Sequence, residues 1–401
     1  MTPMDREAPL IMLAAGGTGG HMIPAHALAE ELKSRGYRLA LITDERGTGY
    51  PGVLEGIRHY VIEAGTITRG GLIARIRGLR RLQAGRKAAK AALEASRPAV
   101  VVGFGGYPAL PTLMAASKLG IRSCIHEQNA VLGRVNRLLA GSAYLVTTSF
   151  EQTARLPTKV RTALTGTPVR RDIRRLAGEP YPVVGTDRLL RILIVGGSQG
   201  ARILGDVVPA AISLLPRAAQ RRLQVTQQCR PEDLDRVRKT YADAGVAAEL
   251  ATYFQDLPER LRWTHLVIAR AGASTLAELT VVGRPAILVP LAIATDDHQA
   301  ANAEELKRAG GAWVIPEQDF TAAALAKRLQ RLANDPKSLE DAAAACAALG
   351  RPEAAERLAD RVETLMQAAP GMRAVGGAAE AHAQTRAEPR FPDGPLERVT
   401  P

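Results

Sequence analysis

Two stretches of this 401-residue chain repeat one order of elements, and they restrict its fold more than any other feature. Each has a short apolar run, a glycine-rich turn and the start of a helical pattern: "LIMLAAGGTGGHMIPA" from residue 10 and "RILIVGGSQGARILG" from residue 191. Glycine costs backbone entropy, so several in one turn indicate a sharp change of direction or a close approach to a ligand. A strand, a tight turn and a helix form the repeating unit of parallel α/β folds. We therefore predict two α/β domains, each beginning with its own glycine turn.

The remaining apolar runs support this fold class, α/β with two doubly wound parallel sheets. Several are apolar throughout rather than alternating, which is typical of strands covered on both faces. Apolar residues between 203 and 215 recur at the spacing of a helix with one buried face. We expect strands at 10–14, 39–43, 99–103, 123–126, 144–148, within 188–197, and at 223–226, 265–269 and 286–290.

Length and composition restrict the class of protein further. The chain exceeds the usual size of a single hydrophobic core, and a net charge of +13 with a pI of about 10.0 indicates an anionic partner. Aromatic residues make up only 4%, which argues against stacking on single-stranded nucleic acid. The three cysteines lie far apart, as in a reducing compartment and without a structural zinc site. The first apolar run is too short for a signal peptide, so we expect a soluble, cytosolic chain.

The glycine turns are suited to bind phosphate, because N–H groups at a helix start favour negative charge. Neither turn is a P-loop, and Met22 stands where a dinucleotide fingerprint requires glycine or alanine. Asp44 follows the second expected strand in the position of a ribose-binding acid, so a dehydrogenase remains a weaker alternative. Turns without a ligand are the other alternative. His21 follows the first turn, either as a local hydrogen-bond partner or as a general base or phosphate donor.

The second half carries two further polar groups after its strands. In "RAGASTLAEL", Thr275 and Glu278 have the spacing of a capping box, but a carboxylate there also suits a ribose diol. In "DDHQAANA", Gln299 and Asn302 lie one turn apart, either on a solvated helix face or as amides that bind sugar hydroxyls. We expect Asp296 or Asp297 to cap this helix.

Seven motifs occur in one order: "GGTGGH", "GFGGYP", "HEQNAVLGRVN", "TGTPVR", "GGSQGARILG", "RAGASTLAEL" and "DDHQAANA". In order and approximate spacing the chain resembles the MurG family, the N-acetylglucosaminyltransferases that form lipid II in bacterial peptidoglycan synthesis. The resemblance extends from about Leu10 to about Leu365. It implies a GT-B fold, in which two Rossmann-like domains face each other across a cleft. It also implies inverting transfer of GlcNAc from UDP-GlcNAc to the 4-hydroxyl of MurNAc in undecaprenyl-diphospho-MurNAc-pentapeptide, which is lipid I.

The resemblance further implies domain bounds of 1–168, an acceptor and membrane-side domain, and 169–351, a UDP-GlcNAc-binding domain. A last helix at about 352–367 returns to the first domain, and we expect a disordered tail over 369–401. The second domain's substrate-binding residues are then Ser198 and Arg170 at the diphosphate, Glu278 at the ribose, the backbone around Gln255 at the uracil, Gln299 and Asn302 at the sugar, and the helix start Ala273, Ser274 and Thr275. The first domain contributes Thr18, Gly19, Gly20, Asn129 and, on the acceptor side, Tyr107.

The expected chemistry follows from charge. Cleavage of the glycosidic bond leaves negative charge on UDP, which the helix start at Ser198 and the guanidinium of Arg170 are suited to stabilise. Basic groups can carry that charge, so we expect no metal-binding Asp-x-Asp motif and no cofactor for donor binding, and we leave dependence on a divalent cation open. Inversion needs a base near the acceptor hydroxyl, and His21 is the candidate. Two departures from the family pattern are Thr167, where an asparagine is usual, and "PLAIATDDHQ", which lacks a histidine or aromatic residue before its acidic pair.

Residues 69–97 hold nine Arg or Lys and one acidic residue, Glu94, beside apolar residues at helical spacing: Leu72, Ile73, Ile76, Leu79 and Leu82. Such a helix either buries that stripe with its charges in water, or lies on an anionic membrane. Because the implied acceptor is lipid-linked, we favour peripheral association with the cytoplasmic face of the inner membrane. The alternatives are a UDP-GlcNAc epimerase, hydrolase or other glycosyltransferase of the same fold, and a nucleic-acid-binding protein. We expect no nucleic-acid partner, since no recognition motif is present.

Overall fold

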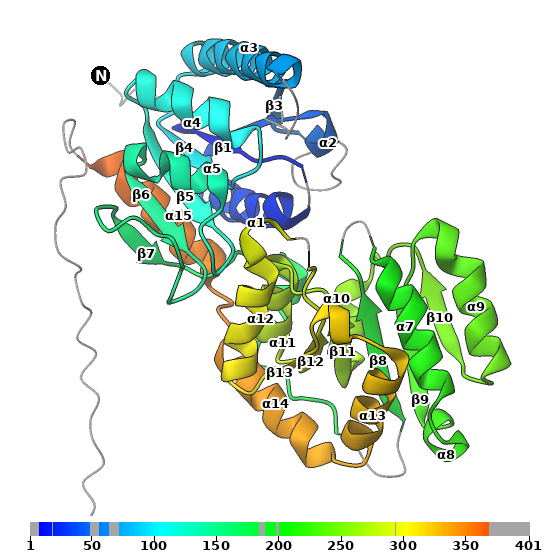
Figure 1. Cartoon of the computed structure of the whole chain (residues 1–401). Coiled ribbons are helices and arrows are strands. Elements are labelled where there is room, and N and C mark those ends of the chain that lie inside the picture. The colour runs from blue at the N-terminus through cyan, green and yellow to red at the C-terminus, as the bar shows by residue number, and fades with distance from the viewer. Residues whose placement is uncertain are drawn as a thin grey trace, which may run out of the picture.

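The structure is a computed structural model that describes residues 8–17, 19–48, 56–63, 72–183, 189–197, 200–292 and 294–368, without the side chains of 72–76 and Thr295. The expected tail, 369–401, lies outside the described residues. Figure 1 shows two α/β domains, one above the other, each with helices on both faces of its sheet.

The N-terminal domain has a seven-stranded sheet in the order β3-β2-β1-β4-β5-β6-β7, and every neighbouring pair is parallel. Its strands are β1 (Leu10–Ala14), β2 (Arg38–Thr43), β3 (Arg58–Val61), β4 (Val100–Gly103), β5 (Arg122–Glu127), β6 (Leu145–Thr148) and β7 (Thr162–Leu164). The strand order reverses at β1, where ligands of open α/β sheets bind beyond the carboxyl ends.

The C-terminal domain repeats this arrangement with a six-stranded sheet in the order β10-β9-β8-β11-β12-β13, also parallel throughout. Its strands are β8 (Leu190–Val195), β9 (Leu223–Gln228), β10 (Ala248–Ala251), β11 (Leu266–Ala269), β12 (Ala286–Leu288) and β13 (Ala312–Val314). By position in the sheet, β8 and β9 correspond to β1 and β2. The predicted fold class, two doubly wound parallel sheets, is confirmed.

Helices connect the successive strands of both domains, except β6 and β7, which a loop joins. Those of the N-terminal domain are α1 (Gly19–Ser34), α2 (Glu45–Thr48), α3 (Leu72–Ser96), α4 (Ala109–Lys118), α5 (Arg134–Leu139) and the 3-10 turn η1 (Ala140–Ser142). Those that follow are α6 (Arg171–Arg174), α7 (Arg202–Ser213), α8 (Arg217–Gln220), η2 (Pro231–Asp233), α9 (Leu234–Asp243), α10 (Leu257–Trp263), α11 (Ala273–Val282), η3 (Thr295–Asp297), α12 (His298–Arg308), η4 (Glu317–Asp319), α13 (Ala322–Ala333) and α14 (Pro336–Ala348).

The last helix, α15 (Ala354–Gln367), lies in the N-terminal domain, where Figure 1 shows it in orange beside β5 and β6. Leu358 and Val362 are buried in one apolar cluster with Ile11 of β1. Arg122 Nη1 donates to the carbonyl oxygen of Leu365 at 2.8 Å. The chain therefore passes between the domains twice, although the exact bounds at 168 and 351 stay predictions.

The central strands are apolar throughout because helices cover them on both sides. On β1, Met12 and Ala14 pack into one cluster, and Ile11 and Leu13 into the cluster on the opposite face. All four are fully buried. Each large apolar side chain buried in this way contributes about 1.5–3 kcal/mol to folding.

All nine expected strands are present, with ends shifted by up to two residues, and the expected buried stripe forms one face of α7. Four strands were not expected: β3, β7, β10 and β13. They are the four edge strands of the two sheets. Within the described residues, every helix is too short or too polar to cross a bilayer.

Candidate active site

The two domains meet where helices α1 and α11 begin, at the carboxyl ends of both sheets; Figure 1 shows α1 directly above α11 and α12. Ser274 Oγ, near the start of α11, donates to the carbonyl oxygen of Gly20 at 3.4 Å. Ala273 and Gly19 are buried on either side of this junction. The two helix starts therefore face the same interdomain region, which is where the anion-binding turns were expected to act.

The first glycine turn is fixed by neighbouring side chains. A Cβ on Gly16 would lie 2.5 Å from Pro108 Cγ, so only glycine fits there. Asp44 Oδ1 accepts from the N–H groups of Gly17 at 3.3 Å and Gly47 at 3.1 Å, while its Oδ2 pairs with Arg46 at 2.7 Å. Asp44 therefore supports the turn itself, and the dehydrogenase alternative loses its ribose acid. Thr18 lies outside the described residues.

His21 follows this turn in the first helical turn of α1. Its Nδ1 atom is buried and has no hydrogen-bond partner among the described residues. A Cβ on Gly105, whose φ is 88°, would lie 2.9 Å from His21 Nε2. The pKa of His21 is lowered to about 4, first by burial and then by the charge of His298, while Asp44 partly opposes this. At neutral pH the imidazole is uncharged, which suits a proton acceptor better than a cationic phosphate donor.

Glu127, at the end of β5, organises the "HEQN" loop and was not predicted to have a role. Its Oε1 accepts from the backbone N–H and the Nδ2 of Asn129, both at 3.0 Å. Its Oε2 accepts from the Gly133 N–H at 2.9 Å and from Asn136 Nδ2 at 2.8 Å. The only sequence signal was a carboxylate two residues before a loop asparagine, which alone does not single it out.

His126, beside Glu127, is fully buried in the core below the site. Its Nδ1 is 3.0 Å from Thr147 Oγ1, and its Nε2 has no hydrogen-bond partner among the described residues. Burial, followed by the charge of His21, lowers the pKa of His126 to about 3. Protonation would place a charge in the core, so His126 is compatible with the folded state only while its imidazole is neutral.

Asn129 and Asn302 were predicted on opposite domains, and the structure brings them into contact. Asn302 Nδ2 donates to Asn129 Oδ1 at 3.0 Å, and Asn302 Oδ1 accepts from the Ala130 N–H at 2.8 Å. A further bond runs from Asn302 Nδ2 to the Ala271 carbonyl oxygen at 3.2 Å. Asn302 is fully buried, so in this structure its amide joins the domains rather than facing an open sugar site.

Arg170 and Glu278 form an ion pair with each other. Arg170 Nε and Nη2 lie 2.9 Å and 2.8 Å from the same carboxylate oxygen, Glu278 Oε1. Burial raises the pKa of Glu278, and Arg170 partly offsets this. The capping-box interpretation of Thr275 and Glu278 is wrong, because the helix begins one residue after Gly272 and has no side-chain cap. The capping position is occupied by Gly272, three residues before Thr275, whereas a capping box would require Thr275 itself to stand there.

The segment before α12 has left-handed backbone at Asp296 and Asp297. Asp297 occupies the N-cap position but makes no capping hydrogen bond, so the expected side-chain cap is absent from these described residues. Asp296 instead pairs across the domains with Arg155 at 2.6 Å and Arg134 at 3.2 Å. Gln299 Oε1 accepts from the Leu291 N–H at 3.1 Å and thereby shapes the loop after β12.

The other predicted site residues lie around this junction or outside the description. Tyr107 is 40% exposed, and Gln255 is exposed in the loop after β10. Ser198 lies outside the described residues. Thr167, the departure from the family pattern, donates from Oγ1 to Ser149 Oγ at 2.7 Å. Both line an interdomain cavity of about 160 Å³ on the side where the chain crosses between the domains.

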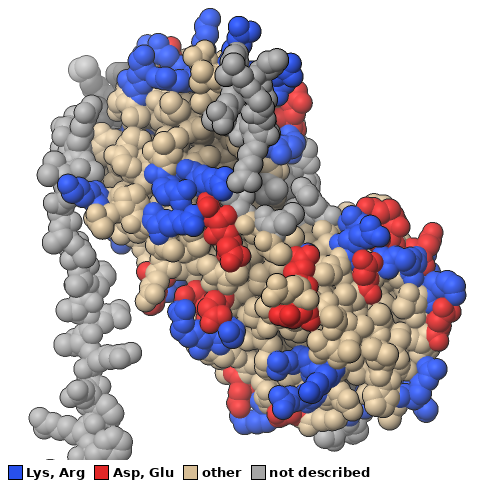
Figure 2. All heavy atoms as spheres, viewed as in Figure 1, with Lys and Arg blue, Asp and Glu red and all other residues tan. Residues whose placement is uncertain are grey.

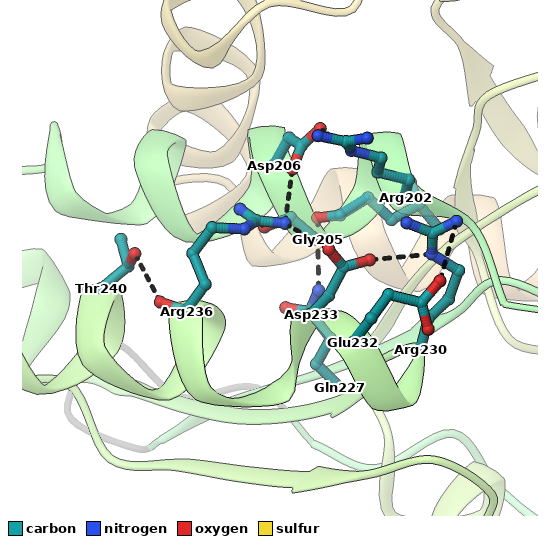
Figure 3. A network of polar contacts seen from close by, with 10 residues as sticks. Arg202, Gly205, Asp206, Gln227, Arg230, Glu232, Asp233, Arg236 and Thr240 are labelled. Carbon is teal, nitrogen blue, oxygen red and sulfur yellow. Dashed lines mark hydrogen bonds and ion pairs between the residues drawn. The ribbon is translucent and has the colours of Figure 1, made fainter.

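A charged network lies beside the second glycine turn (Figure 3). Asp233 accepts from Arg230 Nε and Arg236 Nη2, each at 2.8 Å. The sequence does contain an Asp-x-Asp triplet, Asp233 and Asp235, beside this turn. Its carboxylates are already paired with arginines, Asp235 with Arg238 at 2.6 Å. Among the described residues, no group of three or more His, Cys, Asp or Glu could hold a metal ion.

Comparisons with known proteins identify the class. The glycosyltransferase family 28 N-terminal domain matches residues 11–147, and the family 28 C-terminal domain matches residues 191–358. A protein of Zymomonas mobilis named UDP-N-acetylglucosamine–N-acetylmuramyl-(pentapeptide) pyrophosphoryl-undecaprenol N-acetylglucosamine transferase is 53% identical over 88% of this chain and 91% of its own length.

Two solved structures have the same architecture. MurG of Acinetobacter baumannii superposes with a TM-score of 0.71 at 29% identity, covering 89% of this chain and 99% of that one. A putative UDP-N-acetylglucosamine 2-epimerase of Listeria monocytogenes has a TM-score of 0.61 at 16% identity, covering 89% and 96%. The epimerase likeness shows the fold alone.

The chain has two Rossmann-like domains, and the carboxyl ends of both sheets face one junction. It is a glycosyltransferase with the GT-B fold. Within that class it belongs to the MurG family, the UDP-N-acetylglucosamine–N-acetylmuramyl-(pentapeptide) pyrophosphoryl-undecaprenol N-acetylglucosamine transferases.

Proposed function

We propose that this chain transfers GlcNAc from UDP-GlcNAc to the 4-hydroxyl of MurNAc in lipid I, with inversion at the anomeric carbon. The observation that carries this proposal is the convergence of both domains on one junction. Arg170 and Glu278 pair within the second domain, and Asn302 of that domain binds Asn129 of the first. High identity to the named transferases over nearly the whole chain supports the same substrates.

We further propose that donor binding rearranges the Arg170–Glu278 pair. A guanidinium presents several donors in a planar fork and binds diphosphate as well as carboxylate. When UDP-GlcNAc enters, Arg170 turns toward the diphosphate and Glu278 accepts from the ribose hydroxyls. As the glycosidic bond breaks, the bonding electrons and the negative charge move to UDP, where Arg170 stabilises them.

His21 is the proposed base. The acceptor oxygen attacks the anomeric carbon of GlcNAc. The bond between that carbon and the phosphate oxygen of UDP breaks, UDP leaves, and the hydroxyl proton passes to an imidazole nitrogen. A neutral imidazole is required for this step, and burial keeps His21 neutral at physiological pH. The hydroxyl becomes far more acidic as it forms the new bond, which compensates for a weak base.

Membrane association is proposed from the surface of α3. Figure 2 shows Lys and Arg side chains crowded along the top of the N-terminal domain, where α3 lies in Figure 1, while acidic and basic residues intermingle over the other domain. Among the described side chains of α3, the exposed basic residues are Arg77, Arg80, Arg81, Lys87 and Lys90. Leu79 is 54% exposed among them, whereas Leu82 packs partly against the core. Such a surface suits the cytoplasmic face of an anionic membrane, where a lipid-linked acceptor is found.

The proposed function is tested by UDP release. Purified protein is expected to release UDP from UDP-GlcNAc only when a lipid I analogue is present. UDP release that does not depend on the acceptor would favour a hydrolase or epimerase instead. A lipid I analogue whose MurNAc lacks the 4-hydroxyl is the matched control and is expected to support no release.

A further inference from the structure

Gln228 is the last residue of β9, and its side chain joins two loops at the carboxyl edge of the second sheet. Its Oε1 accepts from the Gly196 N–H at 3.1 Å. Its Nε2 donates to the carbonyl oxygens of Gly197 at 3.1 Å and Thr252 at 3.2 Å. Gly196 and Gly197 begin the glycine turn after β8, and Thr252 begins the loop after β10. One amide thus uses its acceptor and both donors on the backbone of two separate loops.

These two loops contact opposite ends of a UDP molecule under the proposed function, on which this inference rests. The glycine turn was assigned to the diphosphate, and the loop that contains Gln255 to the uracil. Gln228 is only 9% exposed, and its side chain bonds to the backbone of both loops. We propose that Gln228 is a positioning residue for the donor, which sets the separation between the diphosphate and uracil subsites.

The first domain contains the same device at the equivalent position. Asp44 follows β2, the neighbour of β1, as Gln228 ends β9, the neighbour of β8. Asp44 Oδ1 accepts from the N–H of Gly17 in the first glycine turn, as Gln228 Oε1 accepts from Gly196. A glycine turn has no side chains to hold its shape, so a polar group on the adjacent strand supplies the hydrogen bonds. Gln228 differs from Asp44 because its amide also donates hydrogen bonds, whereas a carboxylate only accepts them. The amide can therefore bind carbonyl oxygens, including that of Thr252 in the second loop.

The opposite side of the second turn is also supported. Gly200 has a φ of 68°, and a Cβ there would lie 2.8 Å from Arg230 Cγ. Arg230 is held by Asp233, as Figure 3 shows. Arg230 therefore restricts the end of the turn next to α7. The hydrogen bonds of Gln228 fix the other end, which follows β8 and faces the loop after β10.

The test compares two neighbouring glutamines replaced by methionine, which has a similar length and no charge. Gln228→Met removes the bridge between the loops. Gln227→Met is the matched control, because Gln227 is fully buried and, among the described residues, its side chain bonds to the Leu204 carbonyl oxygen and the Tyr241 hydroxyl and to neither of these loops. Calorimetric Kd for UDP, KM for UDP-GlcNAc and for a lipid I analogue, kcat and melting temperature are measured for each.

Gln228→Met is expected to raise the Kd for UDP and the KM for UDP-GlcNAc by about tenfold or more, the scale of losing two or three hydrogen bonds. The KM for the acceptor is expected to stay unchanged and kcat at saturating donor to fall much less. Gln227→Met is expected to lower the melting temperature at least as far but keep UDP affinity within about twofold. If Gln228→Met does not fold, Gln228→Asn, which keeps the amide on a shorter stem, is expected to show the same loss.

Two results would overturn the inference: UDP affinity of the folded Gln228 variant within about twofold of wild type, or equal loss of UDP affinity in the Gln227 control at an equal loss of melting temperature. A wild-type protein that binds no UDP would instead overturn the proposed function, so the two failures are distinguishable.

Discussion

Arg170 and Glu278 are bonded to each other across 2.8–2.9 Å, although each was predicted to bind a different part of the donor. The carboxylate is nearly buried and the guanidinium is 25% exposed, so the pair lies at the edge of the interdomain region. Before the donor binds, each side chain thereby satisfies the charge of the other. A buried charge left without its partner is costly, which explains why the two residues occur together.

Replacing either member of this pair is expected to weaken the donor complex. Arg170→Ala and Glu278→Ala should each cost about 1–3 kcal/mol in kcat/KM for UDP-GlcNAc, the scale of a hydrogen bond to a charged group. Because the two side chains contact each other, the double variant should lose less than the sum. Steady-state kinetics measure this, with Arg175→Ala as the control, since Arg175 forms an exposed pair with Asp172 at 3.0 Å. Wild-type kinetics in both single variants would contradict the assignment.

Loss of His21 is expected to affect turnover more than donor affinity. His21→Ala should lower kcat by about a hundredfold or more, the usual contribution of a general base, with a small change in KM for UDP-GlcNAc. His265→Asn is a suitable control, because His265 is also buried and its pKa is also lowered to about 4. His265 lies in the C-terminal domain, where its Nδ1 accepts from the Arg191 N–H of the same domain. An equal loss of kcat and donor affinity in His21→Ala would make His21 a binding residue instead.

Acid is expected to destabilise the fold through His126. Its pKa is about 3 in the folded protein and 6.5 in the unfolded chain, so the unfolded state binds more protons between these values. The free energy of unfolding should therefore decrease as pH falls from 6.5 toward 3, by about 2 kcal/mol from this group at pH 5. Urea unfolding at pH 7.5 and pH 5 measures the loss. His126→Asn should reduce this pH dependence, and an unchanged dependence would refute the role of His126.

Charge and one exposed leucine on α3 are expected to govern membrane binding. Arg80→Glu with Arg81→Glu, and separately Leu79→Ser, should each weaken binding to vesicles that contain anionic lipid, measured by co-sedimentation. Leu214→Ser is the control, because Leu214 is 61% exposed at the end of α7 in the other domain. The α3 variants should retain transferase activity on a water-soluble lipid I analogue with a short lipid chain. Undiminished vesicle binding by both α3 variants would contradict this membrane surface.

The sequence predicted the interior of each sheet and missed its edges for one physical reason. Strands such as β1 and β11 are covered on both faces and read as unbroken apolar runs. Edge strands are partly in water: β3 has the residues Arg58, His59, Tyr60 and Val61, none of which is fully buried. Without a continuous apolar run or a clear alternation, such short segments are not distinguishable from loops.

Site residues were predictable from motifs, but their partners were not. "HEQN" and "DDHQAANA" indicated Asn129 and Asn302, yet the bond between them joins positions 173 residues apart. Glu127 bonds backbone N–H groups and two asparagine side chains in the segment that follows it, and Gln228 bonds backbone groups of two loops. Such bonds leave no spacing pattern in a sequence. The Asp44 carboxylate shows the opposite error, since its position after β2 resembled a ribose site until its bonds to Gly17 and Gly47 were known.

A crystal structure with UDP-GlcNAc bound tests the central claim most directly. We expect the donor between the two domains, with its diphosphate within hydrogen-bonding distance of Arg170 and the turn that begins at Gly196. Its ribose should contact Glu278, and the Arg170–Glu278 pair should be broken or lengthened. A donor bound elsewhere on either domain, with that ion pair intact, would contradict the account.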